Sequence, residues 1–134
     1  MNIPEECKHS GEFEKDCCKV LWSGTIVEHD GCVASGGCDL IAYDDERFLI
    51  IEIKSGKISS EDARKIIEQI ERCEYWYSNF IAHRRKSKIF LHCGNKIRLD
   101  SFARIKLERA NVRMYRCCQG HINLGKIIKN KINI

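Results

Sequence analysis

The clearest pattern along the chain is a pair of apolar segments, residues 36–43 and 48–54, separated by the polar turn Asp44-Asp45-Glu46-Arg47. An apolar run, a polar turn and a second apolar run predict a β-hairpin. Both runs are apolar at nearly every position, which indicates that both faces of the sheet are covered. The runs are interrupted by three charged residues, Asp39, Glu52 and Lys54. Because unpaired buried charge is costly, each of them needs a partner, a metal ion or a polar cleft.

Hydrophobic periodicity predicts the other elements. We expect helices over about residues 10–22, 60–77 and 100–109, and strands over about 25–28, 88–93 and 112–117; the tail, 122–134, is a short helix or an edge element. The resulting order of helices and strands predicts an α/β fold, with a mixed central β-sheet flanked by helices on both faces. The chain has 134 residues and no internal repeat, so we expect a single domain over residues 1–134.

The hairpin determines where the charged residues point. If it turns symmetrically about Asp45-Glu46, facing residues have numbers that sum to 91, and Asp39 lies opposite Glu52. Their Cβ atoms are then about 5 Å apart, and Lys54 shares their face because side chains alternate with period 2. Two carboxylates so close repel unless a proton or a cation lies between them. Oxygen ligands of this kind suit Mg²⁺, and a neighbouring lysine can orient water or stabilise charge on phosphate. The pattern favours metal-dependent phosphodiester hydrolysis.

The segments G-G-x-D at 36–39 and I-I-E-I-K at 50–54 resemble the signature of the PD-(D/E)xK nucleases, the restriction-endonuclease-like superfamily. Upstream, Gly11, Glu14 and Leu21 resemble the first helix of archaeal Holliday junction resolvases, and the resemblance extends over about residues 11–77. Cys38 replaces the proline of the motif, and Glu12 is a second candidate for the helix-borne glutamate. The resemblance implies a restriction-endonuclease-like core that binds Mg²⁺ or Mn²⁺. The metal ligands it implies are Glu14, Asp39, Glu52 and the carbonyl of Ile53, and Lys54 is the implied catalytic lysine.

Several polar residues are candidate contacts to DNA, the expected partner in branched or duplex form. Lys57 is placed to contact a phosphate near the site, and related nucleases often carry a glutamine on the following helix, where Gln69 stands. The basic run Arg84-Arg85-Lys86 could follow the duplex backbone, although such a run is usually a solvated loop. The net charge of +4 is only weak support for nucleic-acid binding. Junction-resolving enzymes act as dimers, and the aromatic surplus at 74–77 fits a homodimer patch.

The chain has nine cysteines and no C-x-x-C pair, which argues against zinc ribbons and thioredoxin chemistry. We interpret most of them as small buried hydrophobic residues; intracellular disulfides, as in hyperthermophilic archaea, are the alternative. Abundant Ile, Lys and Glu with only two glutamines fit a thermophile. No apolar run approaches the ~20 residues that span a bilayer, and no signal-peptide pattern is present, so a cytoplasmic location without membrane contact is expected.

Two other functions fit the same residues. The chain could be a non-catalytic nucleic-acid-binding or assembly module on the same fold, in which case the acidic pair would hold no metal. It could also be an ordinary α/β domain in which Glu52 and Lys54 form cross-strand ion pairs with arginine or aspartate neighbours. The second alternative gives no reason why Asp39 should face the same spot.

Overall fold

The computed structural model describes residues 2–132, without the side chains of residues 95–97, 118 and 129–132. Within this part of the chain, seven strands form one mixed sheet in the order β1-β2-β3-β4-β5-β6, with β7 beside β2. The strands are β1 (Lys8–Lys15), β2 (Cys18–Glu28), β3 (Leu40–Tyr43), β4 (Arg47–Ile58), β5 (Arg85–Leu99), β6 (Val112–Arg116) and β7 (His121–Asn123). The helices are α1 (Ser60–Trp76), α2 (Ser78–Ile81), α3 (Ser101–Arg109) and α4 (Leu124–Ile132), with short 3₁₀ turns at Glu5–Cys7 and Cys118–Gly120.

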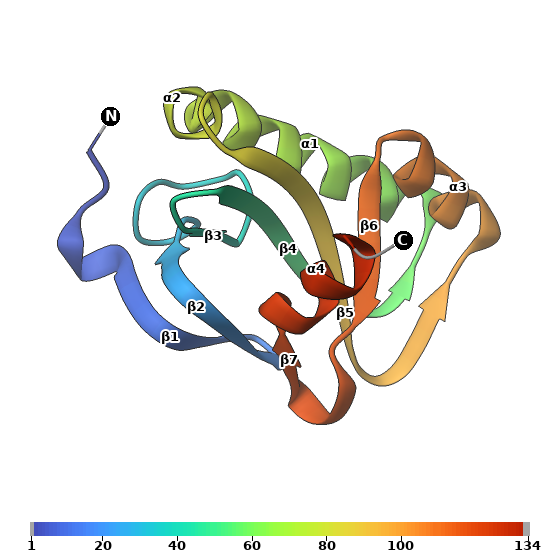
Figure 1. Ribbon diagram of the computed structural model, residues 1–134. Coiled ribbons are helices and arrows are strands. Elements are labelled where there is room, and N and C mark those ends of the chain that lie inside the picture. The colour runs from blue at the N-terminus through green and yellow to red at the C-terminus, as the bar shows by residue number, and fades with distance from the viewer. Residues whose placement is uncertain (1, 133–134) are drawn as a thin grey trace.

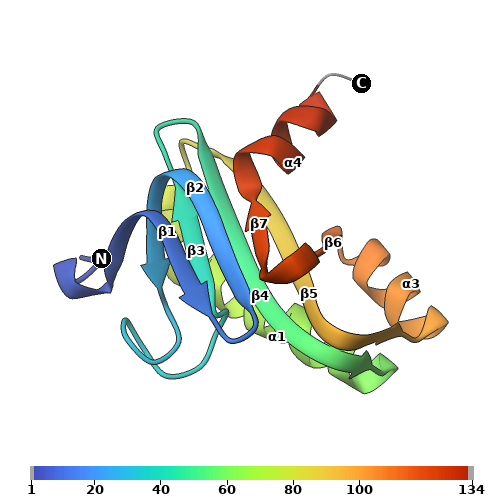
Figure 2. The ribbon, with the colours of Figure 1, turned by 90° about the horizontal axis from the view of Figure 1, so that it is seen from below.

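The sheet has an antiparallel half and a parallel half. Strands β1 to β4 form an antiparallel meander, whereas β4, β5 and β6 are parallel and are connected through α1 and α3. Helix α1 crosses one face of the sheet and α4 lies against the opposite face (Figures 1 and 2). Two apolar cores fill these layers, one under α1 and α3 and the other under α4. The predicted α/β class with a mixed sheet and helices on both faces is confirmed.

The central hairpin has the predicted register. Leu40 pairs with Ile51 and Tyr43 pairs with Phe48, so the numbers of facing residues sum to 91. The turn is closed by the Asp44 side chain, whose Oδ1 accepts hydrogen bonds from the backbone N–H groups of Glu46 and Arg47, both at 2.8 Å. This side-chain bonding is the usual reason for an aspartate at the start of a tight turn.

The predicted helix over residues 10–22 is wrong, because this segment forms the hairpin of β1 and β2. Buried Cys18, Val20 and Trp22 alternate with partly exposed residues, which is the period of a strand. The turn between the strands is Asp16-Cys17, and Asp16 has φ 53°, a left-handed conformation that aspartate tolerates. The apolar spacing that suggests a helix in the sequence therefore belongs to two short strands.

Eight of the nine cysteines form disulfides, and the side chain of the ninth, Cys118, lies outside the described part. The interpretation of most cysteines as small buried residues is correct for their burial, but the paired residues are not separate hydrophobic side chains. The pairs are Cys7–Cys32, Cys17–Cys93, Cys18–Cys117 and Cys38–Cys73. Their Cα–Cα distances are 5.8–6.0 Å, within the usual range for disulfides. Such a number is typical of oxidising compartments and of intracellular proteins of hyperthermophilic archaea.

Helix α1 starts and packs as its sequence predicts. Ser59 caps it: the Ser59 hydroxyl accepts a hydrogen bond from the Asp62 N–H at 3.1 Å, and the Asp62 carboxylate accepts one from the Ser59 N–H at 2.9 Å. Its buried positions are Ala63, Ile66, Ile70 and Cys73. This stripe fixes α1 on the sheet and determines which of its side chains face the acidic pair. Among the described residues, no helix is long and apolar enough to cross a membrane.

Candidate functional site

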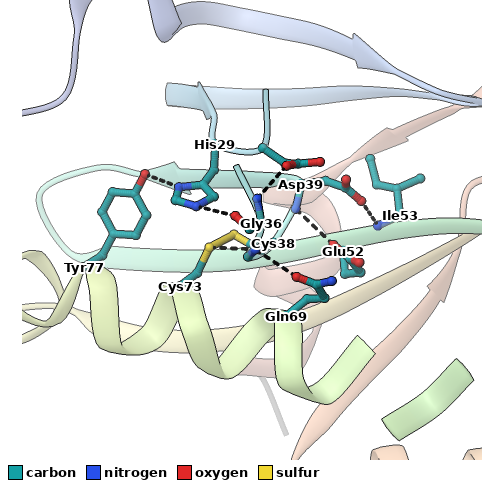
Figure 3. The surroundings of a disulfide bond; sticks show 11 residues. His29, Gly36, Cys38, Asp39, Glu52, Ile53, Gln69, Cys73 and Tyr77 are labelled. Atoms are coloured by element: carbon teal, nitrogen blue, oxygen red, sulfur yellow. Dashed lines mark hydrogen bonds between the residues drawn. A yellow bond between two sulfur atoms is a disulfide. The ribbon is translucent and has the colours of Figure 1, made fainter. Parts of the chain in front are cut away.

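Asp39 and Glu52 meet at the junction of β3 and β4, as the register predicts (Figure 3). The backbone N–H of Asp39 donates to Oε1 of Glu52 at 3.0 Å, and the backbone N–H of Ile53 donates to Oδ2 of Asp39 at 2.8 Å. Each carboxylate is thus held by the backbone of the other strand. Glu52 is almost fully buried, with 6% of its surface exposed, whereas Asp39 is partly exposed. The solvent-side edge of the pair is therefore formed by Asp39.

Burial and mutual repulsion keep a proton on this pair. The pKa of Glu52 is raised to about 9, first by burial and then by the negative charge of Asp39 and a side-chain hydrogen bond between the two carboxyls. Burial also raises the pKa of Asp39, but the hydrogen bonds from Ile53 and Glu52 oppose that effect. The hydrogen bond between the two side chains lowers the pKa of Asp39 and raises that of Glu52, so the proton resides on Glu52. Near neutral pH, without a cation, the pair consists of a carboxylate and a carboxylic acid.

Lys54 follows Glu52 by two residues and lies on the same face of β4. Its positive charge lowers the pKa of Glu52, against the larger effect of burial. Lys54 lines a hollow of about 420 Å³ together with Asp16, Cys17 and Ser55, so the turn between β1 and β2 lies beside Lys54. The negative charge of Asp16 raises the pKa of Asp39, although burial of Asp39 is the larger cause.

Asp16 is the residue that sequence reasoning missed. The sequence offered only a weak signal, because in Cys-Lys-Val-Leu-Trp at 18–22 Leu21 breaks the alternation of apolar and polar residues that would indicate a strand after a turn at Asp16. The disulfide between Cys17 and Cys93 fixes this turn beside β5. The Sγ atom of Cys93 lies 3.8 Å from the carbonyl oxygen of Lys54, so the disulfide also contacts the strand that carries the site.

Glu14 does not join the pair. It is exposed on β1, opposite Lys19, because the predicted helix that was to turn it inward does not form. Among the described residues, no three His, Cys, Asp or Glu side chains are grouped so that they could hold a metal ion. The structure thus brings Asp39 and Glu52 together and places Glu14 on an exposed strand, and a metal-ligand role for Glu14 stays a prediction.

Gln69 lies beside the segment that leads into Asp39. Its Oε1 accepts a hydrogen bond from the Gly37 N–H at 2.8 Å, and one turn further along α1 the Cys38–Cys73 disulfide holds the next residue (Figure 3). The side-chain oxygen of Gln69 is occupied by the backbone, and a contact of Gln69 with DNA stays a prediction. Gln69 thus positions the loop before Asp39.

The other predicted DNA-contacting residues lie apart from the acidic pair. Arg85 pairs with Arg47 in the β4–β5 register, five residues before Glu52, or about 17 Å along the strand. Arg84 bonds the carbonyls of Asp44 and Phe80, and Lys86 forms an ion pair with Glu74.

Lys57 is exposed near the opposite end of β4, past a bulge in the strand. Contacts of Lys57, Arg84, Arg85 and Lys86 with DNA stay predictions.

The donor set suits a hard divalent cation. Asp39 and Glu52 present carboxylate oxygens from adjacent strands, and their shared proton occupies the place where a cation would be electrostatically favoured. The N–H and C=O of one residue in an antiparallel strand point to the same side. Because the Ile53 N–H bonds Asp39, the Ile53 carbonyl also points to the Asp39 side of β4. These oxygens fit the ligands that the sequence predicts.

No protein-family model, curated protein or solved structure matches this chain.

Proposed function

We propose that the protein is a metal-dependent DNA endonuclease whose sheet and helix α1 form a restriction-endonuclease-like core. The single observation that carries this proposal is the convergence of Asp39 and Glu52 from adjacent strands, each bonded by the other's backbone, with Lys54 on the same face. Plain cross-strand ion pairs of Glu52 and Lys54 with arginine or aspartate neighbours would not need a second acid beside Glu52. A site for a divalent cation does need one.

The residues have separate roles in this proposal. Asp39, Glu52 and the carbonyl of Ile53 would hold Mg²⁺ or Mn²⁺, which supplies, when bound, Lewis-acid stabilisation of the phosphate and a more acidic water. Lys54 would orient the attacking water and stabilise negative charge on the phosphate. Glu52 gives up its proton when a cation binds, because a ligating carboxylate must be ionised.

The test is cleavage of a DNA panel by the purified, oxidised protein with Mg²⁺ or Mn²⁺. The panel comprises single strand, duplex, flap and four-way junction, and a branched substrate is expected to be cut best. Glu52→Gln and Lys54→Met should each lower the rate on the order of 100-fold, as expected when one group that stabilises a transition state is removed. Glu108→Gln, an exposed carboxylate on α3, is the matched control.

Unchanged cleavage by Glu52→Gln and Lys54→Met would refute the assignment. The alternative, a non-catalytic nucleic-acid-binding module, is separated by a direct measurement of Mn²⁺ binding. The nuclease proposal expects bound Mn²⁺ that is lost in Asp39→Asn. Wild-type protein that binds DNA but neither binds Mn²⁺ nor cleaves would favour the module. Sedimentation of the same samples tests the expected homodimer.

A further inference from the structure

A cleft lies between α1 and the loop that leads to Asp39, outside the acidic pair. It has a volume of about 740 Å³. From the loop side it is lined by His29, Ser35, Gly36 and Gly37, and from α1 by Glu68, Glu71, Arg72, Tyr75 and Trp76. The α1 residues recur at intervals of three and four positions, so they form one continuous face of the helix. We call this space the α1 cleft.

The α1 cleft carries aromatic surface that the core does not use. Tyr75 is 85% exposed and Trp76 is 48% exposed, whereas their neighbour Tyr77 is buried. Trp76 contacts the ring of His29 edge-on, with centroids 5.8 Å apart. The guanidinium of Arg72 lies against Gly36, where an added Cβ would approach Nη1 to 3.4 Å. Aromatic rings and a guanidinium plane are the groups on which nucleobases stack.

The charges of the α1 cleft select a base over a phosphate. Two carboxylates, Glu68 and Glu71, line it beside the guanidinium of Arg72, and Glu68 forms an ion pair with Arg64. The cleft therefore has no excess of positive charge for a phosphate, whereas the Glu71 carboxylate can accept hydrogen bonds from the amino groups of bases. The cleft is lined by nine residues, fewer than the 20–30 that each partner contributes to an ordinary protein–protein interface. Its size and chemistry therefore fit a single planar group better than a second copy of the chain.

The wall of the α1 cleft is preformed and continuous with the acidic pair. Nε2 of His29 lies 3.0 Å from the carbonyl oxygen of Gly36, and Nδ1 lies 2.7 Å from the Tyr77 hydroxyl (Figure 3). Asp30 accepts a bond from the Gly36 N–H at 3.0 Å. Gly37 is two residues from Asp39, a span of at most about 7 Å. One wall of the cleft therefore lies within about 7 Å, along the backbone, of Asp39.

We infer that the α1 cleft binds an unpaired nucleobase against the rings of both Tyr75 and Trp76, next to the phosphodiester that lies at Asp39 and Glu52. This inference rests on the proposed nuclease function for the phosphodiester but not for the base. It assigns a substrate class, DNA with at least one unpaired nucleotide at the cleavage position. A perfect duplex, whose bases are already stacked and paired, must first extrude a base at an energetic cost.

The test measures binding of DNA without metal, in EDTA, so that no cleavage is needed. Fluorescence anisotropy gives the affinity for a single strand and for a blunt duplex of the same length. Tyr75→Ala and Trp76→Ala should each weaken single-strand binding about 10-fold, the loss expected for one stacked base, and should change duplex binding less than about twofold. Phe102→Ala is the matched control, because Phe102 is an exposed aromatic residue, 69% exposed, on α3. A single strand carrying 2-aminopurine should show quenched fluorescence with wild-type protein and recovered fluorescence with Tyr75→Ala.

The outcomes separate this inference from the proposed function. If Tyr75→Ala and Trp76→Ala bind a single strand as tightly as Phe102→Ala does, the inference is overturned, even if Glu52→Gln abolishes cleavage. If they lose single-strand affinity while no variant or wild-type protein cleaves DNA, the base site stands and the nuclease proposal fails. A change in sedimentation of Tyr75→Ala with unchanged DNA affinity overturns the inference in favour of a contact between two copies.

Discussion

Replacing Glu52 by glutamine should stabilise the metal-free protein, and the gain should grow with pH. The wild-type side chain is buried and holds its proton with a pKa of about 9, whereas an unfolded glutamate has the ordinary value of 4.5. Glutamine reproduces the protonated acid closely. Its Oε1 can accept from the Asp39 N–H, and its amide can donate to the Asp39 carboxylate.

The magnitude follows from the difference between the two pKa values. Between pH 4.5 and pH 9 the folded state retains a proton that the unfolded state has lost, so the free energy of unfolding falls by about 1.4 kcal/mol per pH unit. The stability contributed by the protonated carboxyl is complete below pH 4.5 and is lost as pH rises towards 9. The stability lost relative to pH 4.5 amounts to about 3 kcal/mol at pH 7 and about 6 kcal/mol at pH 9. Because the pKa of Asp39 is also raised, its titration acts in the same direction.

Urea unfolding at pH 5, 7 and 9, with EDTA and intact disulfides, measures this effect. The gap in unfolding free energy between Glu52→Gln and wild type should widen with pH, whereas Glu108→Gln, exposed on α3, should follow wild type at every pH. Parallel curves for wild type and Glu52→Gln would refute the reasoning, because they would mean that Glu52 is ionised in the folded protein over the whole range.

Three further predictions concern the surroundings of the pair. Removing the Cys38–Cys73 disulfide by the double change Cys38→Ser and Cys73→Ser should cost about 2–4 kcal/mol, since it closes a loop of 35 residues; thermal unfolding checks this, and an unchanged Tm would contradict it. Gly37→Ala should cost about 1–3 kcal/mol, because Gly37 has φ 89° and an added Cβ would lie 2.8 Å from Nε2 of His29; a chemical denaturation curve that overlays wild type would show that the loop can move aside. Glu14→Gln should leave Mn²⁺ affinity and any cleavage rate within about twofold, since Glu14 is exposed on β1; loss of either property would restore Glu14 as a ligand.

The central hairpin could be predicted because its signals are local. Asp44 closes the turn through its own side chain, and a two-stranded antiparallel register follows once the turn is located. The position of Asp39 opposite Glu52 then follows from the residue numbers, because facing residues sum to 91. Helix α1 was equally predictable, since its cap at Ser59 and its buried stripe both lie within one segment.

The structure of the first 22 residues could not be predicted in the same way. Short apolar segments fit both a period of 2 and a period of 3.6, and the sequence contains no local signal that chooses between them strongly. The choice is made by partners far along the chain, because β2 pairs with β3 and β7 and Cys18 bonds Cys117. The position of Glu14 depended on that choice.

By itself, the sequence determined the hairpin, its register and the meeting of two acids and a lysine on one face. These depend on alternation along a strand and on one tight turn, which are short-range properties. Only the tertiary structure decided that Asp16 lies beside Lys54 while Glu14 is exposed on β1, that the cysteines pair across the fold, and that Tyr75 and Trp76 border a cleft beside Asp39. Each of these depends on contacts between residues distant in the chain, which only the packing of the sheet and helices specifies.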